Sequence, residues 1–332
     1  MLGWNPCASS GVQHYMRCSS VFSCWFVLLT AISAPLTSCQ SVDQAPPQAP
    51  GQLDLGGRKL HLYCTGSGPP TVILEAGAGS FSTDWVLIQT EIAKTTRVCS
   101  YDRAGYGWSD PGPEWDTVTQ VESDLHAALN KAGVHAPLVL VGHSMGRIFA
   151  RWYQQEHRDD VIGMVLIESY ETTAPVNGKP VPLYTLTKEL QTNLPPPSSL
   201  KKPPLPTEVH PPFDKLPPSL QKTHVLLERH FFETLDFNKG PEMMESWRAG
   251  ITKLHGASLM PDSLHGIPLF VISREDMNED EGQQQKALAH QSAHSRWEIA
   301  VGSGHFVQLE RPELVIDAIT NVLRGVRGGS GG

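Results

Sequence analysis

The stretch "PLVLVGHSMGRIFARWY", residues 137–153, changes character within a few positions. A run of apolar, β-forming residues ends at Gly142, Ser144 stands between two glycines, and helix-forming residues follow. This order predicts a strand, a sharp turn and a helix. Gly142 to Gly146 match the pattern G-x-S-x-G, which in this context holds a nucleophilic serine. We therefore predict that Ser144 is a nucleophile on a turn whose glycines allow close backbone packing. The helix N-terminus beside it favours developing negative charge.

A serine nucleophile needs a general base, and His305 has the expected position among the 14 histidines. It follows the last predicted strand, in the glycine-bearing sequence "VGSGHF", and precedes the last predicted helix. The partners of a G-x-S-x-G serine follow it in the order acid, then histidine, and His305 satisfies that order. The alternative interpretation of His305 is a solvated loop histidine. His143, next to the serine, is interpreted as a structural residue.

The acid that would orient the histidine has more than one candidate. A carboxylate has to hold the imidazole in one tautomer and offset its positive charge. We predict Asp276, which lies three residues past Ser273 in the loop after the strand "PLFVIS". The alternatives are Glu168 and Glu171, at the end of the strand "VIGMVLIES". The other acidic residues of the Asp276 loop are interpreted as a solvated face.

Two backbone N–H groups are needed to stabilise the oxyanion of an acyl-transfer intermediate. One is predicted at Met145, the residue after the nucleophile, and the other at Ala78 in the sequence "LEAGAGS". Small residues in that loop let the backbone approach a substrate carbonyl. An ordinary tight turn is the alternative interpretation of the same loop.

Short apolar runs alternate with helical patterns on both sides of this stretch, which predicts a largely parallel sheet with helices on both faces. A hairpin turning at Gly56-Gly57 is expected over residues 52–66. The other expected strands are 71–77, 96–102, 137–142, 161–169, 267–273 and 296–302. The expected helices are 84–95, 119–133, 145–157, 282–294 and 311–326.

The alternation stops over residues 171–265, which we interpret as a lid inserted between two strands of one sheet. The lid has a proline-rich connector and two predicted helices, at 220–235 and 241–255. The hydrolytic core would then comprise residues 51–170 and 266–325, followed by a flexible tail at 326–332.

The N-terminal residues 1–39 are predicted to be a signal peptide, because the apolar run "VFSCWFVLLTAISA" suits a signal-peptide core. The sequence "LTSC" that follows, ending at Cys39, resembles the lipobox of bacterial lipoproteins. Lipidation of Cys39 would anchor an exported, periplasmic or cell-surface protein to a membrane, with residues 40–50 as a flexible linker. The alternative is a buried apolar helix.

Composition narrows the classes of partner. The formal net charge is −8 and no Lys/Arg-rich cluster interrupts the chain, which argues against a nucleic-acid partner. Beyond the predicted signal peptide only Cys64 and Cys99 remain, so the chain is not a disulfide scaffold. Neither cysteine is in a CxxC pair and no His/Cys cluster has zinc spacing, so we predict no structural metal. The sequence does not indicate an oligomeric state.

Four segments, "LEAGAGSFSTDW", "YDRAGYGWSD", "GHSMG" and "GSGHFVQLERPELVIDAI", resemble the α/β-hydrolase family in order and spacing. The resemblance implies an eight-stranded, mostly parallel sheet with the active site at the strand ends under the lid. It implies that Asp102 and Arg103 are structural residues near the site. It also makes the strands of Cys64 and Cys99 neighbours, so that a disulfide could join them in an oxidising compartment.

The resemblance implies a serine hydrolase that cleaves carboxylic esters through an acyl-enzyme, without a cofactor. An amidase, a carbon–carbon bond hydrolase or a cofactor-free haloperoxidase would use the same elements, because a fold does not determine a reaction. A catalytically silent binding protein is the alternative from another class. The chain departs from the family at Arg147, where a glycine is common.

Overall fold

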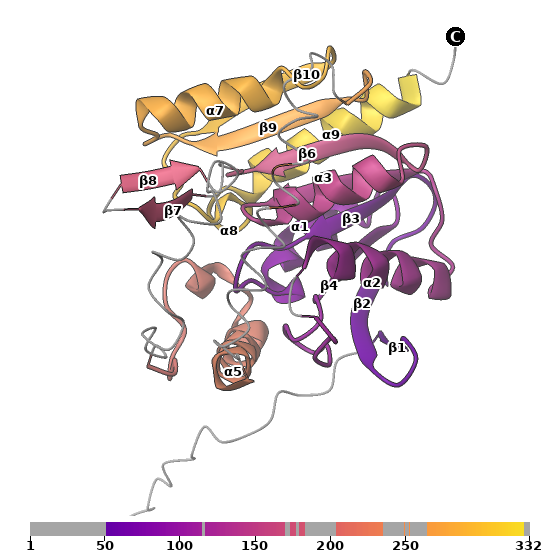
Figure 1. The fold of residues 1–332 in the computed structure, drawn as a ribbon, viewed down its shortest axis with the longest axis vertical. Coiled ribbons are helices and arrows are strands. Elements are labelled where there is room, and N and C mark those ends of the chain that lie inside the picture. The colour runs from indigo at the N-terminus through magenta and orange to yellow at the C-terminus, as the bar shows by residue number, and fades with distance from the viewer. Residues whose placement is uncertain are drawn as a thin grey trace, which may run out of the picture. The chain divides into compact units, whose positions relative to one another are not determined.

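An eight-stranded sheet forms the centre of the computed structural model, with the strand order β1-β2-β4-β3-β5-β6-β9-β10. β2 pairs antiparallel with both β1 and β4, and every other neighbouring pair is parallel. The strands are β1 (Gln52–Asp54), β2 (Lys59–Thr65), β3 (Thr71–Glu75), β4 (Val98–Tyr101), β5 (Leu138–His143), β6 (Val161–Ile167), β9 (Leu269–Arg274) and β10 (Ser295–Ala300). This topology confirms the predicted α/β-hydrolase fold (Figure 1).

The structure describes residues 51–114, 117–169, 173–176, 179–182, 204–234, 249, 252 and 264–328. The predicted signal peptide at 1–39 and the linker at 40–50 lie outside these residues. Within the described part of the chain, no helix is both long enough and apolar enough to span a bilayer.

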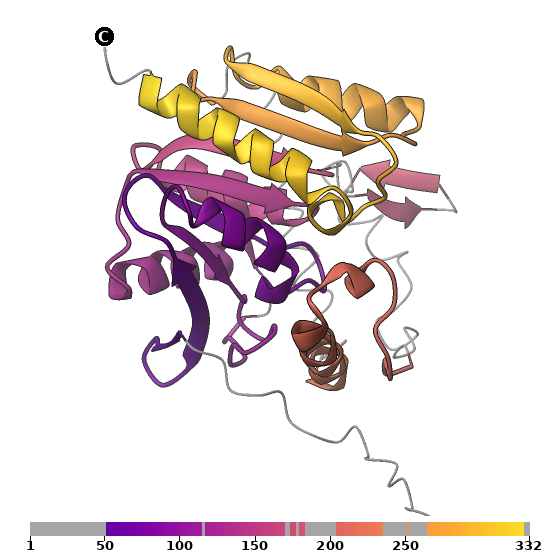
Figure 2. The same ribbon diagram turned by 180° about the vertical axis from the view of Figure 1, so that it is seen from behind.

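Helices cover both faces of the sheet, as Figures 1 and 2 show from opposite sides. One face carries α2 (Val118–Lys131), α3 (Gly146–Glu156) and α7 (Glu279–Ala289). The other face carries α1 (Val86–Ile92), which the 3-10 turn η1 (Ser82–Trp85) precedes, and α9 (Pro312–Gly328), which follows the short α8 (Val307–Glu310). These positions match the helices expected from periodicity.

The core is divided by the sheet into two apolar layers. In β5, Leu140 packs into the layer under α2 and α3, whereas its neighbours Val139 and Val141 pack into the layer under α1 and α9. Because successive side chains of a strand point to opposite faces, a strand covered on both sides has to be apolar throughout. That requirement explains the unbroken "LVLV" run before the nucleophile turn, all of which is buried.

The chain leaves the sheet after β6 and returns at β9, and the predicted insertion falls between these strands. Its best-described part is the 3-10 turn η4 (Phe213–Lys215) and α5 (Pro218–Thr234), close to the helix expected at 220–235. The antiparallel pair β7 (Thr173–Val176) and β8 (Lys179–Pro182) was not expected from the sequence. Prolines interrupt its apolar pattern, which a two-stranded ribbon tolerates because its outer edges need no partners. Most of the second predicted helix, 241–255, lies outside the described residues.

A disulfide bond joins Cys64 of β2 to Cys99 of β4. The two residues are directly opposite each other in the antiparallel pair, with Cα atoms 4.0 Å apart. The bond closes a loop with a sequence separation of 35 residues that contains β3 and α1. It therefore ties the antiparallel edge of the sheet to its parallel centre.

Replacing both cysteines by alanine is expected to lower the free energy of unfolding by about 4 kcal/mol, because the unfolded chain regains the entropy of an open loop. Urea denaturation of the wild type and the double variant measures this difference. A non-reducing digest should release the Cys64 and Cys99 peptides as one species. Separate peptides with free thiols would contradict the disulfide.

Candidate active site

Ser144 occupies the turn between β5 and α3 with a φ of 53°. This left-handed conformation is unfavourable for a residue with a side chain, and it persists only where surrounding contacts enforce it. The Ser144 N–H donates to Ile167 O at 2.8 Å, and the Ser144 carbonyl accepts from Arg147 N at 3.1 Å. The turn is thus held both by the neighbouring strand β6 and by the first residues of α3.

The glycines of the G-x-S-x-G pattern mark places where backbone segments nearly touch. A Cβ on Gly146 would lie 2.5 Å from Glu75 O and 2.8 Å from Ala76 O, at the end of β3. A Cβ on Gly142 would lie 3.0 Å from Arg147 N. A side chain at Gly146 would therefore push the start of α3 away from the sheet. The pattern read from the sequence has a steric cause in the fold.

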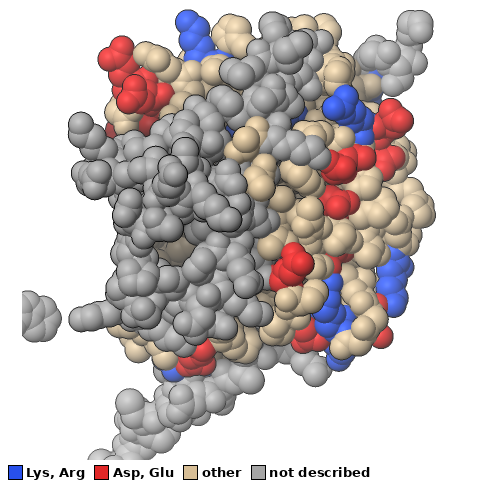
Figure 3. All heavy atoms as spheres, viewed as in Figure 1, with Lys and Arg blue, Asp and Glu red and all other residues tan. Residues whose placement is uncertain are grey.

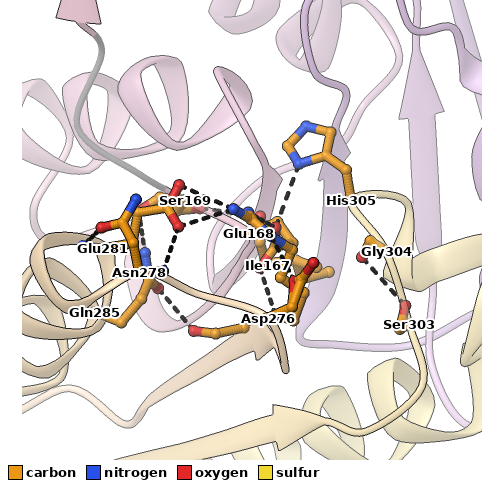
Figure 4. A network of polar contacts seen from close by, with 12 residues as sticks. Ile167, Glu168, Ser169, Asp276, Asn278, Glu281, Gln285, Ser303, Gly304 and His305 are labelled. Atoms are coloured by element: carbon orange, nitrogen blue, oxygen red, sulfur yellow. Dashed lines mark hydrogen bonds and ion pairs between the residues drawn. The ribbon is translucent and has the colours of Figure 1, made fainter. Parts of the chain in front are cut away.

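The carboxylate that faces His305 belongs to Glu168. Its Oε2 lies 3.4 Å from His305 Nδ1, as Figure 4 shows. The Glu168 side chain is 0% exposed, whereas His305 is 42% exposed. Glu168 directly follows β6 and has a φ of 49°, and its N–H donates to Ile272 O of β9 at 2.8 Å. A buried acid thus meets the inner nitrogen of a histidine that is accessible from outside.

The predicted acid Asp276 faces solvent in the structure. Its side chain is 93% exposed, and its Oδ1 lies 3.8 Å from Arg274 Nε. Arg274, which precedes the Asp276 loop, contacts Glu168. Of the two alternatives, Glu168 is the one that contacts His305, and Glu171 lies outside the described residues.

Arg274, the last residue of β9, balances the buried charge of Glu168. Its side-chain Nη1 donates to Glu168 Oε2 at 2.7 Å, and its backbone N–H donates to Oε1. Nη2 of the same guanidinium donates to both oxygens of Glu281 at 2.9 Å. Because a buried carboxylate is costly unless it is paired and hydrogen-bonded, these contacts with Arg274 stabilise Glu168 beside His305.

His143, interpreted as structural, contacts the backbone of the candidate base. Its Nε2 donates to the His305 carbonyl at 2.8 Å, and its Nδ1 accepts from Gln308 Nε2 at 3.3 Å. The two imidazole rings are 4.8 Å apart. Burial, together with the charge of His305, lowers the pKa of His143 to about 3. His143 is therefore a neutral donor that holds the His305 loop. The sequence offered no sign of this role beyond its position beside Ser144.

A second contact on the same loop was missed by the sequence analysis. Glu310, on α8, accepts from the backbone N–H of Gly304 at 2.9 Å and from the Ser303 hydroxyl at 3.3 Å. These bonds hold the two residues that precede His305. The loop is thus fixed from one side by Glu310 and from the other by His143.

The predicted oxyanion loop is braced by Arg103. This buried guanidinium donates to Ala76 O at 2.7 Å, to Gly77 O at 2.8 Å and to Glu75 Oε1 at 2.9 Å. Its three acceptors lie directly before Ala78, which the structure leaves exposed at the turn. Met145 immediately precedes α3, where helix geometry leaves N–H groups without intrahelical acceptors. Both predicted N–H donors thus lie on segments that contact Gly146.

Asp102, next to Arg103, is also a structural centre. Its carboxylate accepts from the backbone N–H groups of Ser82 at 2.7 Å and Trp108 at 3.1 Å, and it contacts His61 Nδ1 at 3.0 Å. A Cβ on Gly107 would lie 2.3 Å from one of its oxygens. Asp102 therefore holds the sequence "YDRAGYGWSD" as a compact loop against η1.

Arg147 is half-buried in the first turn of α3. Arg151 lies one turn later on α3. Burial, and then the positive charge of Arg147, lower the pKa of Arg151 to about 9. Ser144 keeps its left-handed turn despite this large side chain, so Arg147 does not disturb the backbone of the elbow.

Helix α5 of the insertion is packed on the core close to the oxyanion loop. His224 Nδ1 lies 3.1 Å from Asp84 Oδ1, and both side chains are buried. The His224 ring stacks on Phe213 with centroids 4.1 Å apart, and Phe213 meets Phe306, the neighbour of His305, at 4.9 Å. Aromatic contacts thus run from the insertion to the loop of the candidate base. Among the described residues, no group of three or more His, Cys, Asp and Glu side chains has the arrangement of a metal site.

Comparison with known proteins identifies the family. The model of the alpha/beta hydrolase family matches residues 72–318, and the chain belongs to that family. It is 31% identical over 127 residues to "Probable transporter efuK" of Hormonema carpetanum, covering 36% of this chain and 18% of that protein. It is 33% identical over 103 residues to YqjL of Bacillus subtilis (strain 168), covering 31% of this chain and 41% of that protein. The match thus spans less than half the length of these curated relatives.

Solved structures share the fold at low identity. One is a thermophilic esterase from Thermogutta terrifontis, with a TM-score of 0.55, 20% identity, and coverage of 83% of this chain and 97% of that chain. Another is the enol-lactonase from Burkholderia xenovorans LB400, with a TM-score of 0.58, 18% identity, and coverage of 82% of this chain and 99% of that chain. A third is an epoxide hydrolase from Vigna radiata, with a TM-score of 0.57, 16% identity, and coverage of 82% of this chain and 96% of that chain. All three are hydrolases, and at these identities the likeness establishes the fold.

The contact between Glu168 and His305 predicts that replacing Glu168 and replacing Asp276 by their amides will have different effects on the labelling rate of Ser144. Glu168→Gln is expected to slow the reaction of Ser144 with an acylating probe by about 10³- to 10⁴-fold, because the imidazole loses its orientation and charge partner. Asp276→Asn, at an exposed carboxyl, should stay within about 3-fold of the wild type. Pseudo-first-order labelling rates measure both. The reverse ranking would restore Asp276 as the acid.

The lowered pKa of His143 predicts loss of stability in acid. An unfolded histidine takes up a proton below pH 6.5, whereas folded His143 resists it until about pH 3. The unfolded state therefore binds more protons in this window, and acidification favours unfolding. From pH 7 to pH 5 the wild type should lose about 2 kcal/mol more unfolding free energy than His143→Asn. Urea titrations at both pH values measure this.

A matched control uses the exposed His135. His135→Asn should lose as much stability on acidification as the wild type, because that side chain is exposed to solvent and leaves the buried His143 unchanged. Equal acid sensitivity of the wild type and His143→Asn would contradict a buried neutral His143.

Proposed function

We propose that the protein is a serine hydrolase that cleaves carboxylic esters through an acyl-enzyme. The observation that carries the proposal is the buried Glu168 carboxylate against His305, on the same edge of the sheet as the strained Ser144 turn. A nucleophile, a base and an acid that orients the base are the components of acyl transfer. No step of the proposed reaction requires a cofactor.

In the proposed reaction, the Ser144 hydroxyl attacks the ester carbonyl while His305 takes its proton. The negative charge that develops on the carbonyl oxygen is stabilised by the N–H groups of Met145 and Ala78. Collapse of this intermediate expels the alkoxide, which His305 protonates, and leaves Ser144 acylated. A water molecule, deprotonated by His305, then attacks the acyl group, and the carboxylic acid is released with Ser144 restored.

Glu168 and Arg274 suit this cycle electrostatically. The positive charge that His305 gains in each half-reaction develops beside a buried carboxylate that is paired with Arg274. Such preorganised charge needs no rearrangement at the moment of reaction. The esterase and the enol-lactonase among the structural neighbours give a second line of support, because a lactone is a cyclic ester. The serine nucleophile distinguishes the proposal from chemistry that starts from an aspartate.

The disulfide between Cys64 and Cys99 supports the expectation that the protein is exported. Disulfides persist in oxidising compartments and are rare where thiols are kept reduced. We extend the proposal to a periplasmic or cell-surface location, with Cys39 as the candidate lipid anchor. Metabolic labelling with a fatty-acid analogue, compared with Cys39→Ser, tests the anchor.

A fluorophosphonate probe tests the proposed chemistry directly. The wild type should be labelled on Ser144 and lose its activity toward p-nitrophenyl esters, whereas Ser144→Ala should show neither labelling nor hydrolysis. The matched control is Ser273→Ala, which removes a buried hydroxyl that bonds to Gln285 and Trp297 and should leave labelling intact. A folded wild type that takes no label would overturn acyl transfer and favour a silent binding protein. Esters of increasing acyl length then define the substrate.

A further inference from the structure

A cavity of about 500 Å³, the α1 cavity, lies between α1 and the strands β2 and β4. Its polar floor consists of buried side chains from all three elements and from η1, among them His61, Ser82, Gln89 and Ser100. Its walls include Trp108, Val86 and, from α5, Leu220. None of the residues assigned to the proposed catalysis lines it. Figure 2 shows this side of the sheet, with α1 crossing in front of the strands. A cavity of this size accommodates a small organic molecule.

His61 gives the cavity a specific polar group. The side chain is only 3% exposed, and its Nδ1 lies 3.0 Å from Asp102 Oδ2. Since the carboxylate only accepts, Nδ1 carries the proton in the neutral tautomer and Nε2 is left as an acceptor. No described residue hydrogen-bonds to Nε2, and this atom is not completely buried. Nε2 is therefore an acceptor that a molecule in the cavity can reach.

The lining also determines the charge of a suitable ligand. The lining residues that the structure describes include no Lys, Arg, Asp or Glu side chain, so none of them would compensate an ionised group. Gln89 and Ser100 are already bonded to each other at 2.7 Å, and the Gln89 amide donates to Tyr63 O at 2.9 Å. Trp108 lies 4.9 Å from the His61 ring and offers an aromatic surface beside the acceptor.

We propose that this cavity binds a small neutral molecule with a hydroxyl donor on an aromatic or short aliphatic body. The hydroxyl donates to His61 Nε2, and the apolar body packs against Trp108 and Val86. The site is independent of the proposed ester hydrolysis, since it lies on the α1 face of the sheet and uses no residue of that reaction. A ligand there contacts both η1 and α5, because Thr83 and Leu220 belong to the same lining.

The test uses two fluorinated probes that differ only in the donor. The full chain is titrated with 4-fluorophenol, which is neutral at pH 7, and with 4-fluoroanisole, in which a methyl group replaces the hydroxyl proton. Binding is followed by ¹⁹F NMR. The phenol is expected to bind at least about tenfold more tightly, because the ether leaves the His61 acceptor unpaired. Equal binding of the two probes, or no binding of the phenol at about 5 mM, would overturn the proposal.

Two variants on α1 locate the site. Thr90 is exposed and lines the cavity, so Thr90→Phe should fill it without disturbing the core and weaken phenol binding at least about tenfold. Glu91 is the neighbouring exposed residue and does not line the cavity, so Glu91→Phe should bind like the wild type. Unchanged binding in Thr90→Phe, or equal loss in both variants, would place the phenol elsewhere and refute the assignment. Both outcomes are independent of Ser144 chemistry.

Discussion

The buried carboxylate of Glu168 is the interaction on which the rest of the site depends. It accepts hydrogen bonds from the backbone N–H and the guanidinium of Arg274, and it faces the imidazole of His305. It thus joins the ends of β6 and β9 to the loop after β10. An ionised group without solvent is tolerated only with such partners, so the three segments have to meet at one point. The insertion between β6 and β9 leaves this junction intact because the two strands are direct neighbours in the sheet.

Most of the sheet could be predicted from the sequence because its signals are local. Runs such as "LVLV" and "VIL" are apolar throughout, which only strands covered on both faces require. The elbow was equally predictable, since Gly146 is dictated by the backbone contact with Glu75. The β7–β8 pair was missed because its prolines break the strand pattern, and its pairing depends on a ribbon with free edges.

The sequence could not decide between Glu168 and Asp276 as the acid, because the decision depends on where each carboxylate points. Glu168 and Asp276 both follow strands that end at the same edge, and a shift of one residue reverses the face that a side chain occupies. The left-handed backbone of Glu168 turns its carboxylate inward, which no composition rule reveals. His143 and Glu310 were missed for a related reason. Their role lies in backbone hydrogen bonds to a distant loop, and residue type alone does not indicate such partners.

The described face of the molecule has interspersed acidic and basic side chains and no region of a single sign (Figure 3). Buried polar contacts also surround the short segment 81–85. Asp84 contacts His224 of α5. The Ser82 N–H donates to Asp102, and Asp102 also contacts His61 of the α1 cavity. This segment begins immediately after the oxyanion loop. The buried contact between His224 and Asp84 therefore packs α5 against the core beside this segment.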